Sequence, residues 1–400
     1  MNEEQQPCAD RTPLAARPPN QRRDSATWKL PYLCLEPTRQ GHGVYVRVSG
    51  IAGGLNRRGW AVKLYSPGYR ETGPQPGALQ RLYRILGTQL RFLLDLRRGQ
   101  PVFIRSHFAS AATALLCRWL FRCPVVQELH GPFEDAYIAW PAMRPFRRII
   151  DWLYRLQLRR ADGVITVTPQ LKDYIAQQAG GVRVCVVPNG ADLRRFQAGV
   201  ARPDSLSLPE RYVVFYGSFA AWQGLDVLVD ALESPDWPQE VHVVAAGTGS
   251  LEAFLRDAAA RLERFHLIGR QPHDAMPGII ANGLAALVAK TNVGDRIGTG
   301  LSPVKLYEAM ACGIPVICSR LPPMAAMVEA ADCGLVVPPA DASALARAVA
   351  RLAGDPALVA TMGARGRAAA EAAHSWDDRA ADTDRFLREV FHLPPAERDE

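Results

Sequence analysis

Short apolar runs rich in valine and isoleucine recur along most of the chain, and longer segments with helical spacing separate them. Runs that are apolar on both faces are typical of strands buried in a parallel sheet and joined through helices. Six such runs in the first half span residues 30–36, 61–66, 101–106, 124–129, 163–168 and 183–188. Six in the second half span residues 212–217, 241–247, 265–269, 284–289, 314–319 and 333–338. We therefore predict an α/β protein with two doubly wound parallel sheets.

The boundary between the two halves is predicted at residues 197–210, which lack periodicity and contain proline, serine and glycine. A chain of 400 residues suits two domains of ordinary size. Residues 1–28 and the tail after about 393 are polar and proline-rich, and we expect both to be disordered. In paired sheets of this kind ligands bind beyond the carboxyl ends of the strands, so function is expected in the cleft between the halves.

Charge and cysteine usage narrow the possible partners. The formal net charge of +7 favours a partner with phosphate groups, nucleic acid or an acidic membrane surface. The eight cysteines form no C-x-x-C pair and no zinc-like spacing, which is typical of reduced intracellular thiols. The N-terminal segment has no apolar core of a signal peptide, and no run approaches the ~18–20 apolar residues of a membrane span. We expect a cytoplasmic protein, attached at most to the inner face of a membrane.

The most informative stretch is residues 300–319, GLSPVKLYEAMACGIPVICS. Ser302 and Pro303 form an N-cap and N1 pair, which predicts a helix whose free amides and positive dipole end face an anion. Lys305 lies in the first turn, where it can reach the same phosphate. Glu308 lies one turn later, near Lys305 on the surface, and its carboxylate could accept two hydrogen bonds from a ribose diol. The alternative interpretation is an ordinary capped helix with a surface Lys–Glu pair.

This stretch resembles the donor-binding motif of the GT-B glycosyltransferases, in particular the retaining family 4, also called glycosyl transferases group 1. The resemblance is carried by Glu308, Ala309, Met310 and Ala311, followed by Gly313, Pro315, Val316 and Ile317. It implies that Glu308 holds the nucleotide ribose, and that the backbone from Leu301 through Ser302 and Pro303 to Val304 holds the diphosphate. The first of the family's two glutamates would fall at Gly300, so a side chain used against the donor sugar is missing.

Other segments resemble the same family's donor domain. Residues 212–232 look like its first strand, glycine turn and helix, and Gly217 would let the backbone approach phosphate closely. The family commonly has arginine and lysine where this chain has Ser218 and Gln223, so we expect Lys305 to carry more of the diphosphate charge. In relatives, the backbone at the position of Gly269 and Arg270 faces the base.

The first half resembles the family's acceptor domain. Gly41 and Gly43 would bring backbone amides near the sugar phosphate, and His42 is either a contact or a plain loop residue. His130 follows a strand end and is either a structural histidine or a sugar ligand. In the family this position often contacts a donor-sugar hydroxyl, by hydrogen bonding rather than proton transfer. Residues 188–196 resemble the family's P-N-G-x-D segment, and residues 374–391 resemble its closing helix.

The resemblance implies two Rossmann-like domains with parallel sheets facing across a cleft. Residues 29–200, with a closing helix at 375–392, would form the acceptor side, and residues 205–373 would bind the donor. It implies transfer with retention from a UDP- or GDP-linked sugar to a saccharide acceptor, without cofactor, metal or nucleic acid. We expect His130 and Lys305 to serve catalysis. A GT-B nucleotide-sugar epimerase, a phosphorylase or a non-catalytic scaffold with this fold are the alternatives.

Two segments mix leucine and aromatic residues with arginine. Residues 79–99 and 139–160 have the pattern of basic amphipathic helices, which can lie on anionic lipid. The alternative is a pair of core-facing helices with solvated arginines. If the segments meet lipid, the acceptor is expected to be lipid-linked or part of a surface polysaccharide.

Overall fold

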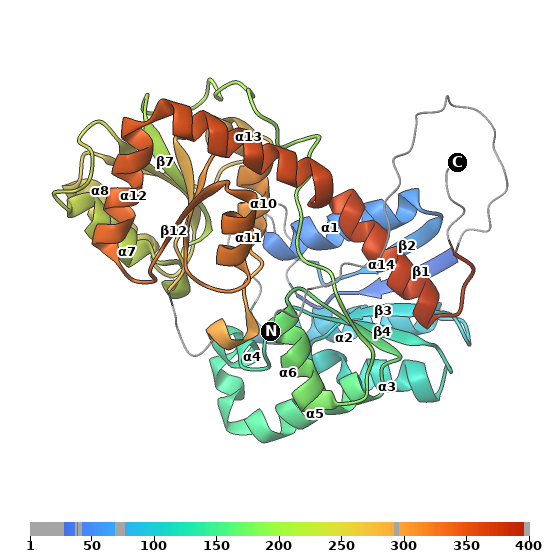
Figure 1. Cartoon of the computed structure of the whole chain (residues 1–400). Coiled ribbons are helices and arrows are strands. Elements are labelled where there is room, and N and C mark those ends of the chain that lie inside the picture. The colour runs from blue at the N-terminus through green and yellow to red at the C-terminus, as the bar shows by residue number, and fades with distance from the viewer. Residues whose placement is uncertain (1–27, 37, 39–41, 69–76, 292–295, 396–400) are drawn as a thin grey trace.

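The computed structural model describes residues 28–36, 38, 42–68, 77–291 and 296–395. Its two halves each contain a six-stranded sheet covered by helices on both faces (Figure 1). All twelve predicted strands are present and every strand pair is parallel, so the predicted α/β fold is confirmed. The predicted disordered segments lie largely outside the described residues. Trp28 begins the first strand, so the predicted start of the folded part was one residue late.

The sheet of the first half has the strand order β2-β1-β3-β4-β5-β6. The direction in which the strands are added reverses between β1 and β3, which makes this the switch point of the sheet. The strands are β1 (Trp28–Leu33), β2 (Trp60–Tyr65), β3 (Val102–Arg105), β4 (Val125–Leu129), β5 (Gly163–Thr166) and β6 (Val184–Val186).

The sheet of the second half has the order β12-β11-β10-β7-β8-β9, and its switch point lies between β7 and β10. The strands are β7 (Tyr212–Ser218), β8 (His242–Thr248), β9 (Phe265–Gly269), β10 (Ala285–Val288), β11 (Val316–Ser319) and β12 (Gly334–Val337). Because the strands are parallel, all their carboxyl ends meet at one edge of each sheet.

The helices of the first half cover its sheet unequally. One face carries α1 and the final helix α14, and the other face carries α2, α3, α5 and α6. The helices are α1 (Gly43–Arg57), α2 (Ala78–Asp95), α3 (Ala111–Trp119), α4 (Asp135–Ala139), α5 (Arg147–Arg159) and α6 (Pro169–Ala179), with the 3₁₀ turns η1 (Phe108–Ser110) and η2 (Pro141–Phe146).

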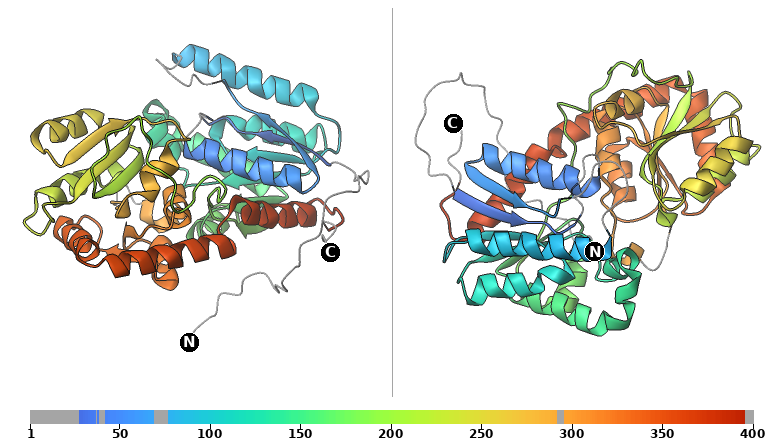
Figure 2. Two further views of the ribbon diagram at one scale, coloured as in Figure 1. Left: turned by 90° about the horizontal axis from the view of Figure 1, so that it is seen from above. Right: turned by 180° about the vertical axis from the view of Figure 1, so that it is seen from behind.

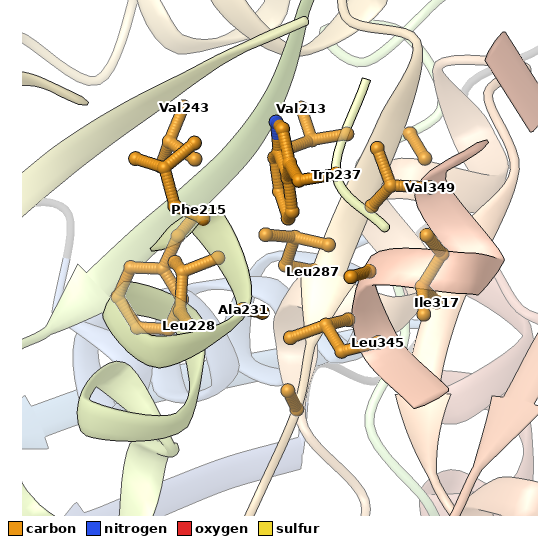
Figure 3. Packing of buried hydrophobic residues seen from close by; sticks show 14 of the residues in the cluster. Val213, Phe215, Leu228, Ala231, Trp237, Val243, Leu287, Ile317, Leu345 and Val349 are labelled. Atoms are coloured by element: carbon orange, nitrogen blue, oxygen red, sulfur yellow. The ribbon is translucent and has the colours of Figure 1, made fainter. Parts of the chain in front are cut away.

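The second half buries the larger part of the apolar core. Figure 3 shows one side of it, where Trp237, Phe215 and Leu287 pack between the sheet and its helices. One face is covered by α7, α8 and α12, and the other by α9, α10 and α11. The elements are α7 (Leu225–Glu233), α8 (Glu252–Arg261), α9 (Met276–Ala281), α10 (Val304–Ala311), α11 (Met324–Ala331), α12 (Ala342–Gly354) and α13 (Pro356–Ala373), with η3 (Ala221–Gln223) and η4 (Arg296–Thr299).

The last two helices carry the chain back from the second half to the first. Figure 2 shows α13 and α14 (Trp376–Val390) in succession along both halves. Gly50 and Gly54 of α1 leave room for Trp376 and Ala380 of α14, since a Cβ at either glycine would lie within 2.6 Å of these side chains. The helix therefore packs closely on α1, as the resemblance implied, while the exact domain boundaries stay a prediction.

Two simpler expectations concern cysteines and membrane spans. The seven cysteines among the described residues are all free thiols, and six of them are buried. None of the helices in the described part of the chain is long and apolar enough to cross a membrane. The cytoplasmic placement stays a prediction.

Candidate active site

Polar groups gather at the switch points of both sheets. In the second half, Gly217 lies near the end of β7 and Lys290 follows β10. In the first half, Glu36 follows β1 and Arg105 ends β3. Crevices at these points are where doubly wound sheets bind ligands. The sequence pattern thus places charged side chains where the fold makes a site.

Lys305 lies in the first turn of α10, and its ammonium reaches the turn that follows β7. Its Nζ lies 3.0 Å from Oε1 of Gln223 and 3.9 Å from the centroid of the Phe215 ring. A Cβ placed on Gly217, whose φ is +116°, would lie 3.9 Å from the same Nζ. Lys305 and Gln223 are each 8% exposed. Lys305 and Gly217, which the sequence analysis assigned separately to the diphosphate, therefore lie beside each other.

The environment of Lys305 favours an incoming anion. Burial lowers the pKa of Lys305 well below its usual value, and the charge of nearby Lys290 lowers it further, while Glu308 opposes the shift. A diphosphate placed here would supply the negative charge that the surrounding side chains do not balance. An anion at this position would therefore favour the protonated form of Lys305.

Glu308 lies one turn after Lys305 and is only 6% exposed, so the predicted surface Lys–Glu pair is wrong. The helix is buried because its apolar residues pack on the sheet and on α13, which turns both charged side chains inward. Burial raises the pKa of Glu308 to about 7, although Lys305, a hydrogen bond from Tyr216 and the charge of Arg195 oppose this. Near neutral pH the carboxyl group can therefore accept hydrogen bonds or donate one.

The start of α10 differs from the prediction. Pro303 is the N-cap and the helix begins at Val304, whereas Ser302 was predicted as the cap. The reason is that the Ser302 hydroxyl is already used: its Oγ accepts a 3.1 Å hydrogen bond from the backbone N–H of Asn189 and lies 2.9 Å from the hydroxyl of Tyr307. Ser302 therefore connects the segment before α10 to the first half through a hydrogen bond and does not cap the helix.

Fewer backbone amides are available for phosphate than the sequence suggested. The N–H of Leu301 donates to the carbonyl of Pro322 at 3.0 Å, and Pro303 has no N–H. The first turn of a helix leaves its amides without intrahelical acceptors, so those of Val304 and Lys305 remain the best candidates for an anion. The amides that remain as candidates thus lie one or two residues later than those predicted.

A buried charge cluster surrounds Glu128 at the end of β4. Its carboxylate contacts Nε of Arg47 at 2.8 Å, the hydroxyl of Tyr32 at 2.5 Å, Nη1 of Arg105 at 3.4 Å and Nε2 of His130 at 3.1 Å. Burial raises the pKa of Glu128, but Arg47, His130 and Arg105 outweigh that effect and hold it well below its usual range. Glu128 is therefore an ionised anchor for the groups around it.

His130 and Glu36 are the more accessible members of this cluster. Burial lowers the pKa of His130 to about 4, with a further lowering by Arg105, so its ring is neutral near pH 7. Glu36 binds Arg105 through both oxygens, at 2.7 and 3.2 Å, and this guanidinium holds its pKa below the usual value in spite of burial. The Glu36 side chain remains 30% exposed. The cluster offers a neutral imidazole and an anionic carboxylate as hydrogen-bonding groups.

Hydrogen bonds connect this cluster to the segment that leads into α10. Nη1 of Arg47 donates to the side-chain oxygen of Asn189 at 3.1 Å. Asn189 in turn binds Ser302 through its backbone N–H and its side-chain amide. A path of polar contacts therefore runs from Glu128 to Ser302, two residues before α10.

Comparison with known proteins identifies the family. A family model described as Glycosyltransferase Family 4 matches residues 41–195, and one described as Glycosyl transferases group 1 matches residues 210–355. Between them the two models cover most of both halves. The chain belongs to the family 4 glycosyltransferases.

Several relatives of this glycosyltransferase have assigned activities. A GDP-mannose-dependent phosphatidylinositol monomannoside mannosyltransferase of Corynebacterium glutamicum is 30% identical over 48% of this chain and 52% of its own length. The D-rhamnosyltransferase WbpZ of Pseudomonas aeruginosa is 24% identical over 68% of this chain and 74% of its own. A lipopolysaccharide core mannosyltransferase of Rhizobium leguminosarum is 28% identical over 67% and 72%. The match thus spans only about half the length of the Corynebacterium relative.

Solved structures show the GT-B fold of this glycosyltransferase. Sucrose-phosphate synthase from Thermosynechococcus elongatus superposes with a TM-score of 0.74 at 20% identity, over 91% of this chain and 99% of that one. Anabaena HepE in complex with UDP-glucose superposes with a TM-score of 0.67 at 17% identity, over 91% and 99%. The predicted pair of Rossmann-like halves is confirmed.

The remaining predicted site residues of the glycosyltransferase are spread around the two clusters. Gly269 ends β9 with a φ of +64°, and a Cβ there would meet nothing within 4 Å, so the backbone is open to a ligand. Arg270 beside it is exposed. Gly43 is the first residue of α1 with His42 as its N-cap, and both are exposed. Gly41 lies outside the described residues.

Sequence reasoning missed several groups that the fold brings to the site, among them Lys290, Tyr216, Glu36 and Arg105. Three of them could have been found, because a charged residue directly after an apolar strand marks the carboxyl edge of a sheet. Tyr216 carries no such signal, since it alternates with apolar residues inside β7. In the described part of the glycosyltransferase no group of three or more histidine, cysteine, aspartate or glutamate side chains could hold a metal ion. Independence from metal stays a prediction.

Proposed function

We propose that this family 4 glycosyltransferase moves a sugar from a UDP- or GDP-linked donor to a saccharide acceptor. The observation that carries the proposal is the buried Lys305 beside Gly217 and Gln223, with the Glu308 carboxyl one turn further along the same helix. This arrangement matches a nucleoside diphosphate, whose phosphates need a cation and whose ribose needs a hydrogen-bonding carboxyl. The Corynebacterium relative uses GDP-mannose, and HepE binds UDP-glucose.

Catalysis would rest on positioning and on electrostatic support of the leaving group. The bond between the anomeric carbon and the diphosphate oxygen breaks, and the acceptor oxygen bonds to that carbon. The acceptor's proton passes to the departing phosphate oxygen on the same face, which gives retention as the family resemblance implies. Lys305 stabilises the charge that grows on the diphosphate, and neutral His130 offers a hydrogen bond to a sugar hydroxyl.

We further propose that no metal ion takes part. Lys305 and the free amides at the start of α10 can balance the diphosphate charge that Mg²⁺ would otherwise balance. The two cations that the family commonly has at Ser218 and Gln223 are missing, and Lys290 next to Lys305 adds a positive charge in their place.

The deciding experiment is a nucleotide-release assay with a panel of UDP- and GDP-sugars and candidate saccharide acceptors. Release of nucleoside diphosphate that depends on the acceptor supports transfer. An epimerase would convert the sugar without an acceptor, and a non-catalytic scaffold would release nothing. Either of these results from a correctly folded preparation would contradict the proposal.

The acceptor is proposed to lie at a membrane, because the first half exposes a large apolar surface. On α2 the exposed apolar side chains follow one another at spacings of one to four residues, and on α3 and α5 further large ones are exposed. They are Leu79, Leu82, Tyr83, Leu86, Leu90 and Leu94 on α2, Leu116, Trp119 and Leu120 at α3, and Phe146, Ile149 and Trp152 at α5. A patch of this extent on a single chain marks an interaction site.

The three helices present this patch together. Oε1 of Gln89 on α2 accepts a 2.6 Å hydrogen bond from Thr113 on α3, so these helices pack side by side. The guanidinium of Arg160, at the end of α5, lies 5.7 Å from the ring of Trp119 on α3. The apolar surface therefore continues from α2 across α3 to α5.

Arginines surround the apolar surface, which favours an anionic lipid surface as its partner. Exposed arginines on or beside these helices are Arg91, Arg97, Arg98, Arg118, Arg122, Arg144, Arg147, Arg148, Arg159 and Arg160. A lipid-linked or surface-polysaccharide acceptor fits this placement, because α2 follows β2 along the chain and so begins at the carboxyl edge of the sheet, where doubly wound sheets bind ligands. The Corynebacterium and Rhizobium relatives act on a phosphatidylinositol mannoside and on the lipopolysaccharide core.

A further inference from the structure

Gly300 occupies a position that disfavours any residue with a side chain. Its φ is +72°, a conformation that residues with a Cβ rarely adopt. A Cβ there would lie 2.6 Å from Oε1 of Gln170 and 3.1 Å from both Cβ of Thr168 and Cδ of Pro323. Thr168 and Gln170 belong to the first half, at the start of α6. Thr168 and Gln170 of the first half therefore fill the space beside residues 299–302, the loop that leads into α10 and is here called the donor loop.

The start of α6 is fixed against this loop. The hydroxyl of Thr168 donates a 2.5 Å hydrogen bond to the carbonyl of Thr299, and both residues are buried. The same oxygen accepts the N–H of Leu171 at 3.1 Å and so caps α6. Gln170 lies in the first turn of that helix, two residues from the bridge. Its position relative to Gly300 is thus set by a hydrogen bond between the halves.

The side-chain oxygen of Gln170 is a buried acceptor without a hydrogen-bond donor among the described residues. Within the described residues, Oε1 of Gln170 is buried and accepts no hydrogen bond. A buried amide oxygen without a donor costs free energy, and native proteins rarely leave one unless water, an ion or a ligand completes it. The natural complement of this oxygen is a hydroxyl or N–H group placed between α6 and the donor loop.

We propose that Gln170 accepts a hydrogen bond from a hydroxyl of the donor's sugar. This inference rests on the proposed function, in which the diphosphate sits at Lys305 and the start of α10. The sugar is bonded to that diphosphate, and the loop of residues 299–302 leads directly into the start of α10. The Gln170 oxygen is an unpartnered acceptor beside that loop, so it can bind a sugar hydroxyl in addition to the one proposed for His130. Glycine at position 300 then serves to admit Gln170.

The proposal predicts that the nucleotide part and the sugar part of the donor are bound by different residues. Gln170 is on α6, whereas Lys305 and Glu308 hold the diphosphate and ribose from α10. Its loss should therefore weaken the binding of the sugar part and leave the nucleotide part unchanged. A structural role at the interface would weaken both, because moving α6 away from Thr299 would also disturb the loop that leads into α10.

The test is calorimetric titration of the wild type and Gln170→Ala with a nucleoside diphosphate and with the matching nucleotide sugar. We expect unchanged affinity for the diphosphate and about a fivefold to tenfold loss of affinity for the nucleotide sugar, the size of one neutral hydrogen bond. Gln177→Ala is the matched control, because Gln177 is exposed on the same helix. A donor lacking the contacted hydroxyl should bind the wild type and Gln170→Ala equally.

Three results would overturn the proposal. Gln170→Ala could bind the nucleotide sugar as tightly as the wild type, or it could lose affinity for the nucleoside diphosphate by the same factor. A set of single deoxy donors could also leave the effect of Gln170→Ala unchanged at every hydroxyl. A wild type that binds the diphosphate but no nucleotide sugar would instead reject the proposed function, and this inference with it.

Discussion

The ammonium of Lys305 lies 3.0 Å from the side-chain oxygen of Gln223, and both groups are buried at the turn after β7. Gln223 is neutral, so it gives the ammonium a hydrogen bond but no compensating charge. Burial and Lys290 therefore keep the pKa of Lys305 low until an anion arrives. A diphosphate would replace the amide as partner, and its growing charge during bond cleavage would make the contact strongest in the transition state.

Lys305→Ala should depress turnover more than donor affinity. Removing one group that stabilises developing charge typically costs about 10²–10³ in rate. Steady-state kinetics with saturating donor measures the effect, and Lys172→Ala, which removes an exposed lysine of α6, is the control. Normal turnover with only a higher KM would show that Lys305 binds the donor without serving the chemical step.

Glu308→Ala should weaken nucleotide binding, because two hydrogen bonds to a charged group would be lost, at about 1.5–3 kcal/mol each. The wild type should also bind the nucleoside diphosphate less tightly as the pH falls below about 7. The ribose diol favours the ionised carboxylate, and in the free protein the pKa of Glu308 is raised to about 7, so binding releases a proton in this range. Titration across pH 5.5–8.5 measures both effects.

Glu308→Gln is the control for this pH dependence. Tyr216, Arg195 and Lys305 also act on this carboxyl, and Lys305 would take up a proton on binding, which is the opposite direction. The glutamine variant keeps these groups and removes only the ionisation of Glu308. An unchanged fall in affinity at low pH would assign the dependence to another group.

His130→Asn should retain most of the activity, whereas His130→Ala should lose more, because the proposed role needs a hydrogen bond and not a proton transfer. Thermal unfolding gives a second readout. Burial lowers the pKa of His130 to about 4, so below about pH 6.5 the unfolded chain binds a proton that the folded one does not, and stability falls toward pH 4. That part of the loss should disappear in His130→Asn. A rate profile governed by His130 near pH 6.5 would contradict the role.

Activity should survive treatment with EDTA. The charge of Lys305 and the amides of α10 are fixed parts of the protein, and chelation does not remove them. The measurement is the initial rate of nucleotide release before and after exhaustive chelation. A rate that disappears with EDTA and returns on addition of Mn²⁺ or Mg²⁺ would show that the proposed metal independence is wrong.

The protein should bind vesicles that contain anionic lipid, and binding should weaken with salt, each basic side chain near the surface contributing about 1 kcal/mol. Replacing Arg144, Arg147 and Arg148 by glutamine should release it and leave nucleotide affinity unchanged. Replacing Arg256 and Arg261, which are exposed on α8 of the other half, is the matched control. Co-sedimentation without preference for anionic over neutral vesicles would reject the lipid surface and favour a second copy of the chain as its partner.

The fold was predictable because each strand is a compact apolar run, and a run buried on both faces has few alternatives to a parallel sheet. The site was predictable where its chemistry lies in one contiguous stretch, as with Lys305 and Glu308. The burial of this pair was not, since spacing along a helix says nothing of which side packs on the sheet. Sequence spacing therefore located the residues and misjudged their environment.

The contacts between the halves could not be read from the sequence. Ser302 has the ideal position for an N-cap, but Asn189, more than a hundred residues away, uses its hydroxyl. Gln170 lies in an ordinary helical segment, and only its contact with Gly300 in the folded structure marks it as a candidate site residue. The absence of a side chain at position 300 was visible in the sequence, whereas the neighbour that fills the space required the three-dimensional arrangement.

The chain passes between the halves twice, once after β6 and once between α13 and α14, and the two passages are tied together. The N–H of Ala191 donates to the carbonyl of His374 at 2.9 Å, and the N–H of Trp376 donates back to Ala191 at 3.0 Å. Gly190 is needed there, because a Cβ would lie 2.8 Å from the His374 carbonyl. These two hydrogen bonds hold the two crossing segments together at one point between the halves. A change in the angle between the halves would therefore be concentrated at this junction, and any separation of Thr168 from Thr299 would break the hydrogen bond that positions Gln170.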